Sequence, residues 1–111
     1  MNLKNAAAER LRRLDALRQA EHSLKMEMDC LDGEQTALER SLRRVQCQVS
    51  EVEGALQVLN PEERLVADML FVYPQRGNVQ RLCGILQVEQ SSVYRRRDRV
   101  LKKMALALFG K

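Results

Sequence analysis

The chain has 111 residues, of which 31% are charged and only 4% aromatic, and its formal net charge is +4. So few aromatic side chains exclude a large core, and sparse Gly and Pro among many Ala, Leu, Glu, Arg and Gln predict an all-α protein. No run of about 18 apolar residues is present to span a membrane. The N-terminus lacks the apolar segment of a secretion signal, so we expect a cytoplasmic protein.

The positive charge belongs to the C-terminal half of the chain. Residues 1–59 carry nine basic and ten acidic side chains, whereas residues 60–111 carry ten basic and five acidic ones. We therefore expect the two halves, residues 1–59 and residues 60–111, to have different tasks.

The first half has the spacing of a coiled coil. From Leu24 to Leu59 residues recur at alternating steps of four and three, all of them apolar except Gln35, which is the heptad pattern. A helix over residues 5–58 would be roughly 80 Å long at about 1.5 Å per residue, and it would need a partner to cover its apolar stripe. A dimer is the commonest outcome, so we expect a homodimer whose oligomerisation residues are Leu24, Met28, Leu31, Gln35, Leu38, Leu42, Val45, Val49, Val52 and Leu56.

Asp32-Gly33 is the point where such a rod could be interrupted. Asp32 and Gln35 can form a capping box, and Gly33 can make the turn of an antiparallel hairpin in which each helix covers the other's stripe. Against a turn, the heptad phase continues undisturbed, and Gly at an outward position costs only about 1 kcal/mol. The pattern narrowly favours the continuous rod and leaves the helical hairpin open.

The second half predicts three short helices. The first begins at Asn60-Pro61-Glu62-Glu63, which supplies an N-cap, a first-turn proline and a capping-box glutamate, and its apolar face ends at Tyr73. A turn at residues 74–77 precedes a helix of nine residues or so, for which Asn78 is the expected cap. A break at residues 87–90 leads into the third helix, whose apolar face consists of Val93, Val100, Leu101, Met104 and Leu108.

The other face of the third helix is strongly basic. Between Tyr94 and Lys103 there are six Arg and Lys residues and one acid, Asp98. A helix with one buried side and one positive side suits a polyanion, and nucleic acid is the commonest polyanion. Two short helices joined by a tight turn, the second basic and the pair preceded by a supporting helix, are typical of a helix-turn-helix domain.

The matching stretches, LNPEERLVADML and NVQRLCGILQVEQSSVYRRRDRVLKKMAL, resemble region 4 of bacterial sigma factors and related phage regulators across residues 59–108. With its helical first half, the whole chain is similar to ArpU- or RinA-type prophage late-gene transcription regulators. The resemblance implies a sequence-specific regulator that binds double-stranded DNA, is derived from a phage or prophage, and has RNA polymerase as a partner. It places the protein in the bacterial cytoplasm or nucleoid, or in the host cytoplasm if a phage encodes it.

Three residues depart from the family pattern. Gln87 stands where the turn usually has Gly, so the turn forms either without positive φ at this position or with some strain. Glu89 replaces the usual Ser or Thr cap, although its charge suits the helix dipole. Arg96 occupies a position that is often apolar, so we expect its stem to pack and its head group to reach the edge.

Helix-turn-helix geometry divides the polar residues into two groups. The N-terminal part of the recognition helix meets base edges, which selects Gln90, Ser91, Ser92, Tyr94 and Arg95. Residues farther along this helix and around the preceding turn are better placed for phosphates. The predicted phosphate contacts are Arg76, Asn78, Arg81, Arg97, Arg99, Lys102 and Lys103.

Other functions have less support from the sequence. A phage DNA-packaging recognition subunit, similar to a small terminase, also joins a helix-turn-helix to an oligomerising helix, and a protein–protein adaptor could present its basic helix to an acidic partner. An enzyme is least expected, because the sequence has no paired carboxylates with a plausible cleft and no phosphate-cradling glycine loop. Cys30, Cys47, Cys83 and His22 fit no metal-binding spacing, so we expect neither a metal nor a cofactor.

Overall fold

The computed structural model describes residues 2–30 and 36–111, and within these ranges the chain is helical and has no β-strand. The order of elements is α1 (Leu3–Cys30), α2 (Thr36–Leu56), α3 (Pro61–Ala67), the π-helical segment η1 (Asp68–Val72), α4 (Asn78–Leu86) and α5 (Gln90–Phe109). The expected all-α class with a long N-terminal helix is confirmed. No described helix combines the length and the apolar character needed to cross a membrane.

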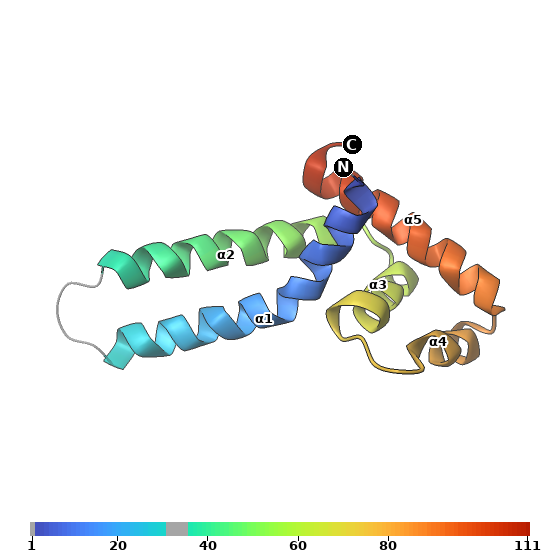
Figure 1. Ribbon diagram of the computed structural model, residues 1–111, viewed down its shortest axis with the longest axis horizontal. Helices are drawn as coiled ribbons and strands as arrows, with labels where there is room; N and C mark the ends of the chain where they lie inside the picture. The colour runs from blue at the N-terminus through green and yellow to red at the C-terminus, as the bar shows by residue number, and fades with distance from the viewer. Residues whose placement is uncertain (1, 31–35) are drawn as a thin grey trace.

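The first half is a helical hairpin and not a continuous rod. Helices α1 and α2 lie side by side (Figure 1). Ion pairs join them, with Arg10 Nη1 3.2 Å from Glu51 Oε2 and Arg18 Nη2 3.0 Å from Glu53 Oε1. The favoured rod is therefore wrong, because a heptad stripe that keeps its phase can face a neighbouring helix of its own chain as well as a second chain. The turn suggested at Asp32-Gly33 lies outside the described residues.

One hydrophobic core joins the two halves of the chain. The first turns of α1 run towards α5, whereas the rest of α1 runs beside α2 (Figure 1). The alanines of α1 have small side chains that let its backbone approach α5 and η1 closely. The chain passes from the hairpin to α3 near residues 59 and 60, and residues on both sides of this point belong to the same buried cluster: Ala7, Leu11, Leu14, Val52, Leu56, Val66, Phe71, Leu82, Val93, Val100, Leu101 and Met104.

Part of the predicted dimer stripe is used inside the chain. Val49, Val52 and Leu56 are at most 5% exposed in this core, so they cannot line a dimer seam as predicted. The stripe residues nearer the free end of the hairpin are half-buried: Leu24, Met28, Leu38, Leu42 and Val45. Leu31 and Gln35 lie outside the described residues.

The helix that follows the hairpin begins as predicted and then changes its winding. Asn60 Oδ1 accepts from the Glu63 N–H at 2.8 Å, and the Glu63 carboxylate accepts from the Asn60 N–H at 3.0 Å, which completes a capping box. In η1 the Tyr73 N–H donates to the Asp68 carbonyl at 2.8 Å. Because a π-turn holds more residues than an α-turn, the inward face moves to Phe71 and Val72. Tyr73, predicted to end the apolar face, is 50% exposed.

A tight turn joins α4 to α5. Gln87 ends α4 with φ 55°, and it is the one non-glycine residue of the described ranges with positive φ. This is the strain expected where Gln replaces Gly. Glu89 precedes α5 in an extended conformation, without a side-chain cap. At the start of α4 the N-cap is Gly77, with φ 84°, so the predicted Asn78 cap is wrong.

The shared core predicts that a cavity in α1 destabilises the whole chain. Leu11 is 0% exposed, and Leu11→Ala is expected to lower the free energy of unfolding by about 2–5 kcal/mol. Leu106→Ala is the matched control, because Leu106 is 62% exposed, and it should change stability by less than about 0.5 kcal/mol. Urea unfolding by circular dichroism, with amide exchange measured in α5, compares the two. Wild-type protection of the α5 amides in Leu11→Ala would contradict a shared core.

Candidate nucleic-acid interface

The apolar face of α5 is covered along most of its length. Val93, Val100 and Met104 are 0% exposed, as the sequence predicts. Helices α3 and α4 pack against α5, and so do α1 and α2, with α1 making the most extensive contact. The sequence did not indicate this role of the hairpin. Because four other helices pack against its apolar face, the orientation of α5 in the fold is fixed, and only its opposite side faces solvent.

The N-terminal end of α5 carries the predicted base-reading residues. Gln90, Ser91, Tyr94 and Arg95 are exposed, with Tyr94 at 49%. Ser92 differs, because it is half-buried and its Oγ accepts from Arg96 Nε at 3.3 Å. This end of α5 and the adjacent α4 lie at the end of the molecule opposite the free end of the hairpin (Figure 1).

One side of α5 carries two exposed arginines, Arg95 and Arg99, that form no ion pair within the described ranges. Ser91, Arg95 and Arg99 are spaced four residues apart, so they share a side of the helix, and all three are exposed. Within the described ranges neither Arg95 nor Arg99 forms an ion pair, and the same holds for Arg76 in the turn before α4. Arg95 and Arg76 therefore keep their donors available, whereas Arg99 also lines the pocket that contains Glu63.

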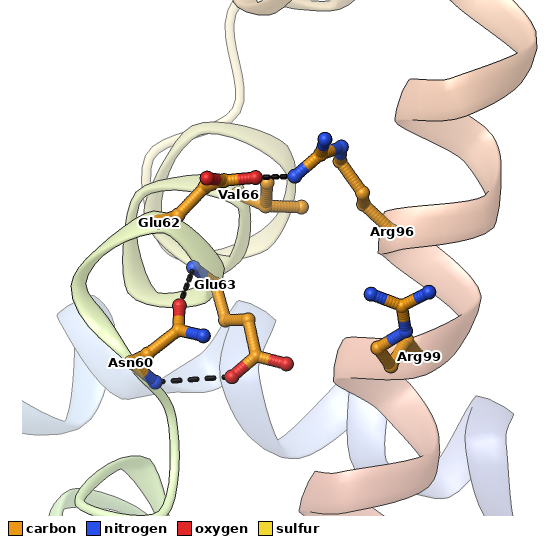
Figure 2. Close-up of a pocket in the computed structure, with 6 residues that line it drawn as sticks. All are labelled: Asn60, Glu62, Glu63, Val66, Arg96 and Arg99. Atoms are coloured by element: carbon orange, nitrogen blue, oxygen red, sulfur yellow. Dashed lines mark hydrogen bonds and ion pairs between the residues drawn. The ribbon is translucent and has the colours of Figure 1, made fainter. Parts of the chain in front are cut away.

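The edge of α5 that faces α3 is already paired. Arg96 forms an ion pair with Glu62, and Lys103 Nζ lies 2.8 Å from Glu63 Oε2. Figure 2 shows the pocket between the two helices, with Arg96 reaching Glu62 and Arg99 on the same side of α5. Arg96 is half-buried as a residue, and its guanidinium group reaches Glu62 at this edge.

Glu63 is the most buried carboxylate of this pocket, with 8% of its surface exposed. Burial opposes its charge, but hydrogen bonds from Lys103 and the Asn60 backbone N–H, with the nearby charge of Arg99, outweigh that effect. The pKa of Glu63 therefore lies below its ordinary value. Lys103 thus neutralises a buried acid, and the phosphate contact predicted for it would have to break this pair.

The opposite edge of α5 packs on α1. Asp98 Oδ1 lies 2.7 Å from Lys4 Nζ, and Asp98 Oδ2 lies 3.3 Å from Lys102 Nζ. The Lys102 side chain is 64% exposed, so this pair is weak and leaves Lys102 accessible. The Arg97 guanidinium lies 5.3 Å from the centre of the Phe71 ring, where it makes a cation–π contact.

Two of the predicted phosphate contacts, Asn78 and Arg81 of α4, form hydrogen bonds within the chain. Asn78 is 6% exposed, and its amide donates to the Met69 carbonyl at 2.6 Å. Its Oδ1 accepts from Arg81 Nη1 at 2.7 Å. The phosphate role predicted for the Asn78 side chain is therefore wrong, because both ends of its amide are engaged inside the protein. Arg81 is exposed, but it also donates to the Arg76 carbonyl at 3.3 Å and so braces the turn.

Sequence reasoning missed the residues of α1 that support this face. Lys4 pairs with Asp98, and the Arg12 guanidinium lies 5.6 Å from the centre of the Phe71 ring, which also faces Arg97. The one sequence feature that could have indicated this contact is the run of three alanines at residues 6–8. Small side chains allow another helix to pack closely against α1, but they do not indicate which helix that is.

The three cysteines of the described ranges are free thiols. Cys30 and Cys47 are exposed, and Cys83 is partly buried against the core. Among the residues that the structure describes, no cluster of His, Cys, Asp and Glu is suited to a metal ion.

No protein-family model, curated protein or solved structure matches this chain.

The Glu63–Lys103 pair gives a testable pH dependence. Because the folded-state pKa of Glu63 is lowered, its charge stabilises the fold above the pKa of the unfolded chain, and this contribution is lost as the pH falls through the folded-state pKa. Glu63→Gln is expected to lower the free energy of unfolding at pH 7 by about 1–3 kcal/mol, with the difference shrinking on acidification. Urea unfolding at a series of pH values measures it.

Glu51→Gln is the matched control for that experiment. Glu51 is also ion-paired, but its side chain is 60% exposed. An exposed pair contributes about 0–1 kcal/mol, so this variant should stay close to wild type at every pH. Equal effects of the two substitutions would contradict the role given to Glu63.

Proposed function

We propose that this protein is a sequence-specific, double-stranded DNA-binding transcription regulator that reads the major groove with the N-terminal half of α5. The observation that carries the proposal is the contrast between the two sides of this helix. Its apolar side is fully buried at Val93, Val100 and Met104, while Gln90, Ser91, Tyr94 and Arg95 are exposed. A helix that enters a groove needs both properties.

Recognition of bases falls to four exposed side chains at the start of α5. Gln90 has the amide that pairs with adenine, and Arg95 has the two donors that pair with the O6 and N7 atoms of guanine. Tyr94 and Ser91 complete this surface. Ser92 lies at the edge of this base-reading surface, and its hydroxyl oxygen already accepts a hydrogen bond from Arg96.

Phosphate binding falls to the basic side chains that are free or weakly paired. Arg99 and Lys102 follow Arg95 along α5, and Arg76 precedes α4. A helix of the sigma region 4-like kind places such residues beside the DNA backbone, where charge matters more than geometry. Lys103 and Asn78 are left out of this set, because both are engaged inside the fold.

Substitution of Arg95 separates base reading from phosphate binding. Arg95→Ala is expected to cost about 1–3 kcal/mol on the preferred site and to relax the preference at one base pair. Arg99→Ala is expected to weaken binding to all sequences evenly and to lower the slope of log affinity against log salt by about 1. Fluorescence anisotropy titrations, on a site selected from random duplexes and on a scrambled duplex at two salt concentrations, measure both effects.

Arg13→Ala is the control for the loss of one positive charge. Arg13 is exposed on α1 beside residues of α2, away from the proposed reading surface, and it should leave binding unchanged. Identical losses for Arg95→Ala on the selected and the scrambled duplex would contradict base reading. Binding without salt dependence would favour a protein partner over DNA for this face.

A further inference from the structure

Arg96 connects a carboxylate of α3 to a hydroxyl group near the start of α5. Its guanidinium group forms an ion pair with Glu62, which lies in the first turn of α3 (Figure 2). Its Nε donates at 3.3 Å to Ser92 Oγ, one helical turn back along α5. Both Arg96 and Ser92 are half-buried, and Ser92 borders the exposed base-reading residues of α5.

The ion pair with Glu62 limits the positions that the Arg96 side chain can adopt. The two side chains are 30% and 44% exposed for Arg96 and Glu62, so both are partly shielded from solvent. Glu62 itself belongs to a turn whose backbone is held by the capping box of Asn60 and Glu63. Because a guanidinium group is planar, an anchor on Nη1 also restricts the direction in which Nε donates. Glu62 therefore helps to hold Nε against Ser92.

The hydrogen bond from Arg96 determines how the Ser92 hydroxyl group can act towards a ligand. A serine hydroxyl group has one proton and two lone pairs. Arg96 occupies one lone pair, whereas no hydrogen bond among the described residues uses the proton. The positive charge beside Oγ disfavours a second donor there, and it polarises the O–H bond. With Arg96 in place, Ser92 is thus suited to donate a hydrogen bond.

We propose that Glu62 is a positioning residue that acts through Arg96, and that it makes Ser92 a donor to an acceptor atom on a base edge in the major groove. The inference rests on the proposed function, because it assigns a chemical preference to one edge of the same reading surface. N7 of a purine and O4 of thymine are acceptors of this kind, whereas the N4 amino group of cytosine can only donate. A residue of the supporting helix α3 thereby contributes to sequence preference.

Glu62→Ala and Ser92→Ala test the proposal singly and in combination. Each single variant is expected to lower the ratio of the affinities for the selected and the scrambled duplex by about three- to tenfold, as for one lost hydrogen bond. The double variant should lose no more than either single variant, because both substitutions remove the same contact. Site selection from random duplexes should show that the preference is relaxed at one base pair. Fluorescence anisotropy titrations measure the ratios, and urea unfolding confirms that each variant is folded.

Asp68→Ala is the matched control for the loss of an ion-paired carboxylate. Asp68 accepts from Arg64 Nε at 3.2 Å, and its side chain is 34% exposed, close to the value for Glu62. Removal of either carboxylate raises the net charge by one, and this change alone should tighten binding to every duplex alike. The control should therefore keep the wild-type affinity ratio, whereas Glu62→Ala lowers it.

Three results would overturn the positioning role of Glu62. These are an unchanged affinity ratio in Glu62→Ala, an equal change of the ratio in Asp68→Ala, and a loss in the double variant that equals the two single losses combined. If wild-type protein binds the selected and the scrambled duplex equally, the proposed function fails and this inference fails with it. Normal discrimination by wild type with unchanged variants overturns the inference alone, so the two failures are distinguishable.

Discussion

Burial of one side of α5 is the constraint on which the rest of this structure depends. An arginine-rich helix does not readily pack against a protein core, because its charged side chains are more stable in water. Here Val93, Val100, Leu101 and Met104 give it an apolar side that α1, α3 and α4 cover together. Ion pairs lie on both edges of the helix, with Glu62 and Glu63 on one side and with Lys4 on the other. What remains in solvent is a narrow positive side that begins at the tip of the molecule.

The hairpin serves this arrangement at its near end and leaves its far end without a matching layer. Leu11 and Leu14 belong to the buried core, whereas Leu24 and Leu38 lie outside it and are half-buried. The same heptad stripe thus changes its environment along its length. Its inner part is buried in the core, and its outer part is only half-buried.

The sequence predicted the C-terminal half of the fold well, because its signals are local. Asn60 and Glu63 form the capping box that their spacing indicates, and Val93 and Met104 lie on the buried side that their period indicates. The strain at Gln87 was one of the two outcomes considered for the replacement of Gly. Each of these features depends on residues only a few positions apart.

The errors concern contacts between residues far apart in sequence. A heptad pattern in constant phase does not distinguish a rod from a hairpin, since either gives the stripe a partner. The π-turn of η1, which exposes Tyr73 and buries Phe71, leaves no mark in the apolar spacing. For the candidate site the exposed end of α5 was predicted, but Lys103 was assigned to phosphate although it pairs with Glu63, 40 positions away. The residue type alone does not show whether a Lys or Arg side chain is free to bind a ligand or is ion-paired with a buried acid of the same chain.

The central claim is that the solvent side of α5 meets a DNA duplex. Titration of the isotope-labelled protein with a duplex, followed by amide chemical shifts, tests it most directly. We expect the largest shifts at Gln90–Arg99 and in the turn around Arg76, with little change at Arg40–Arg44 of the hairpin. Shifts centred on α1 and α2, or none at all at low salt, would contradict the account.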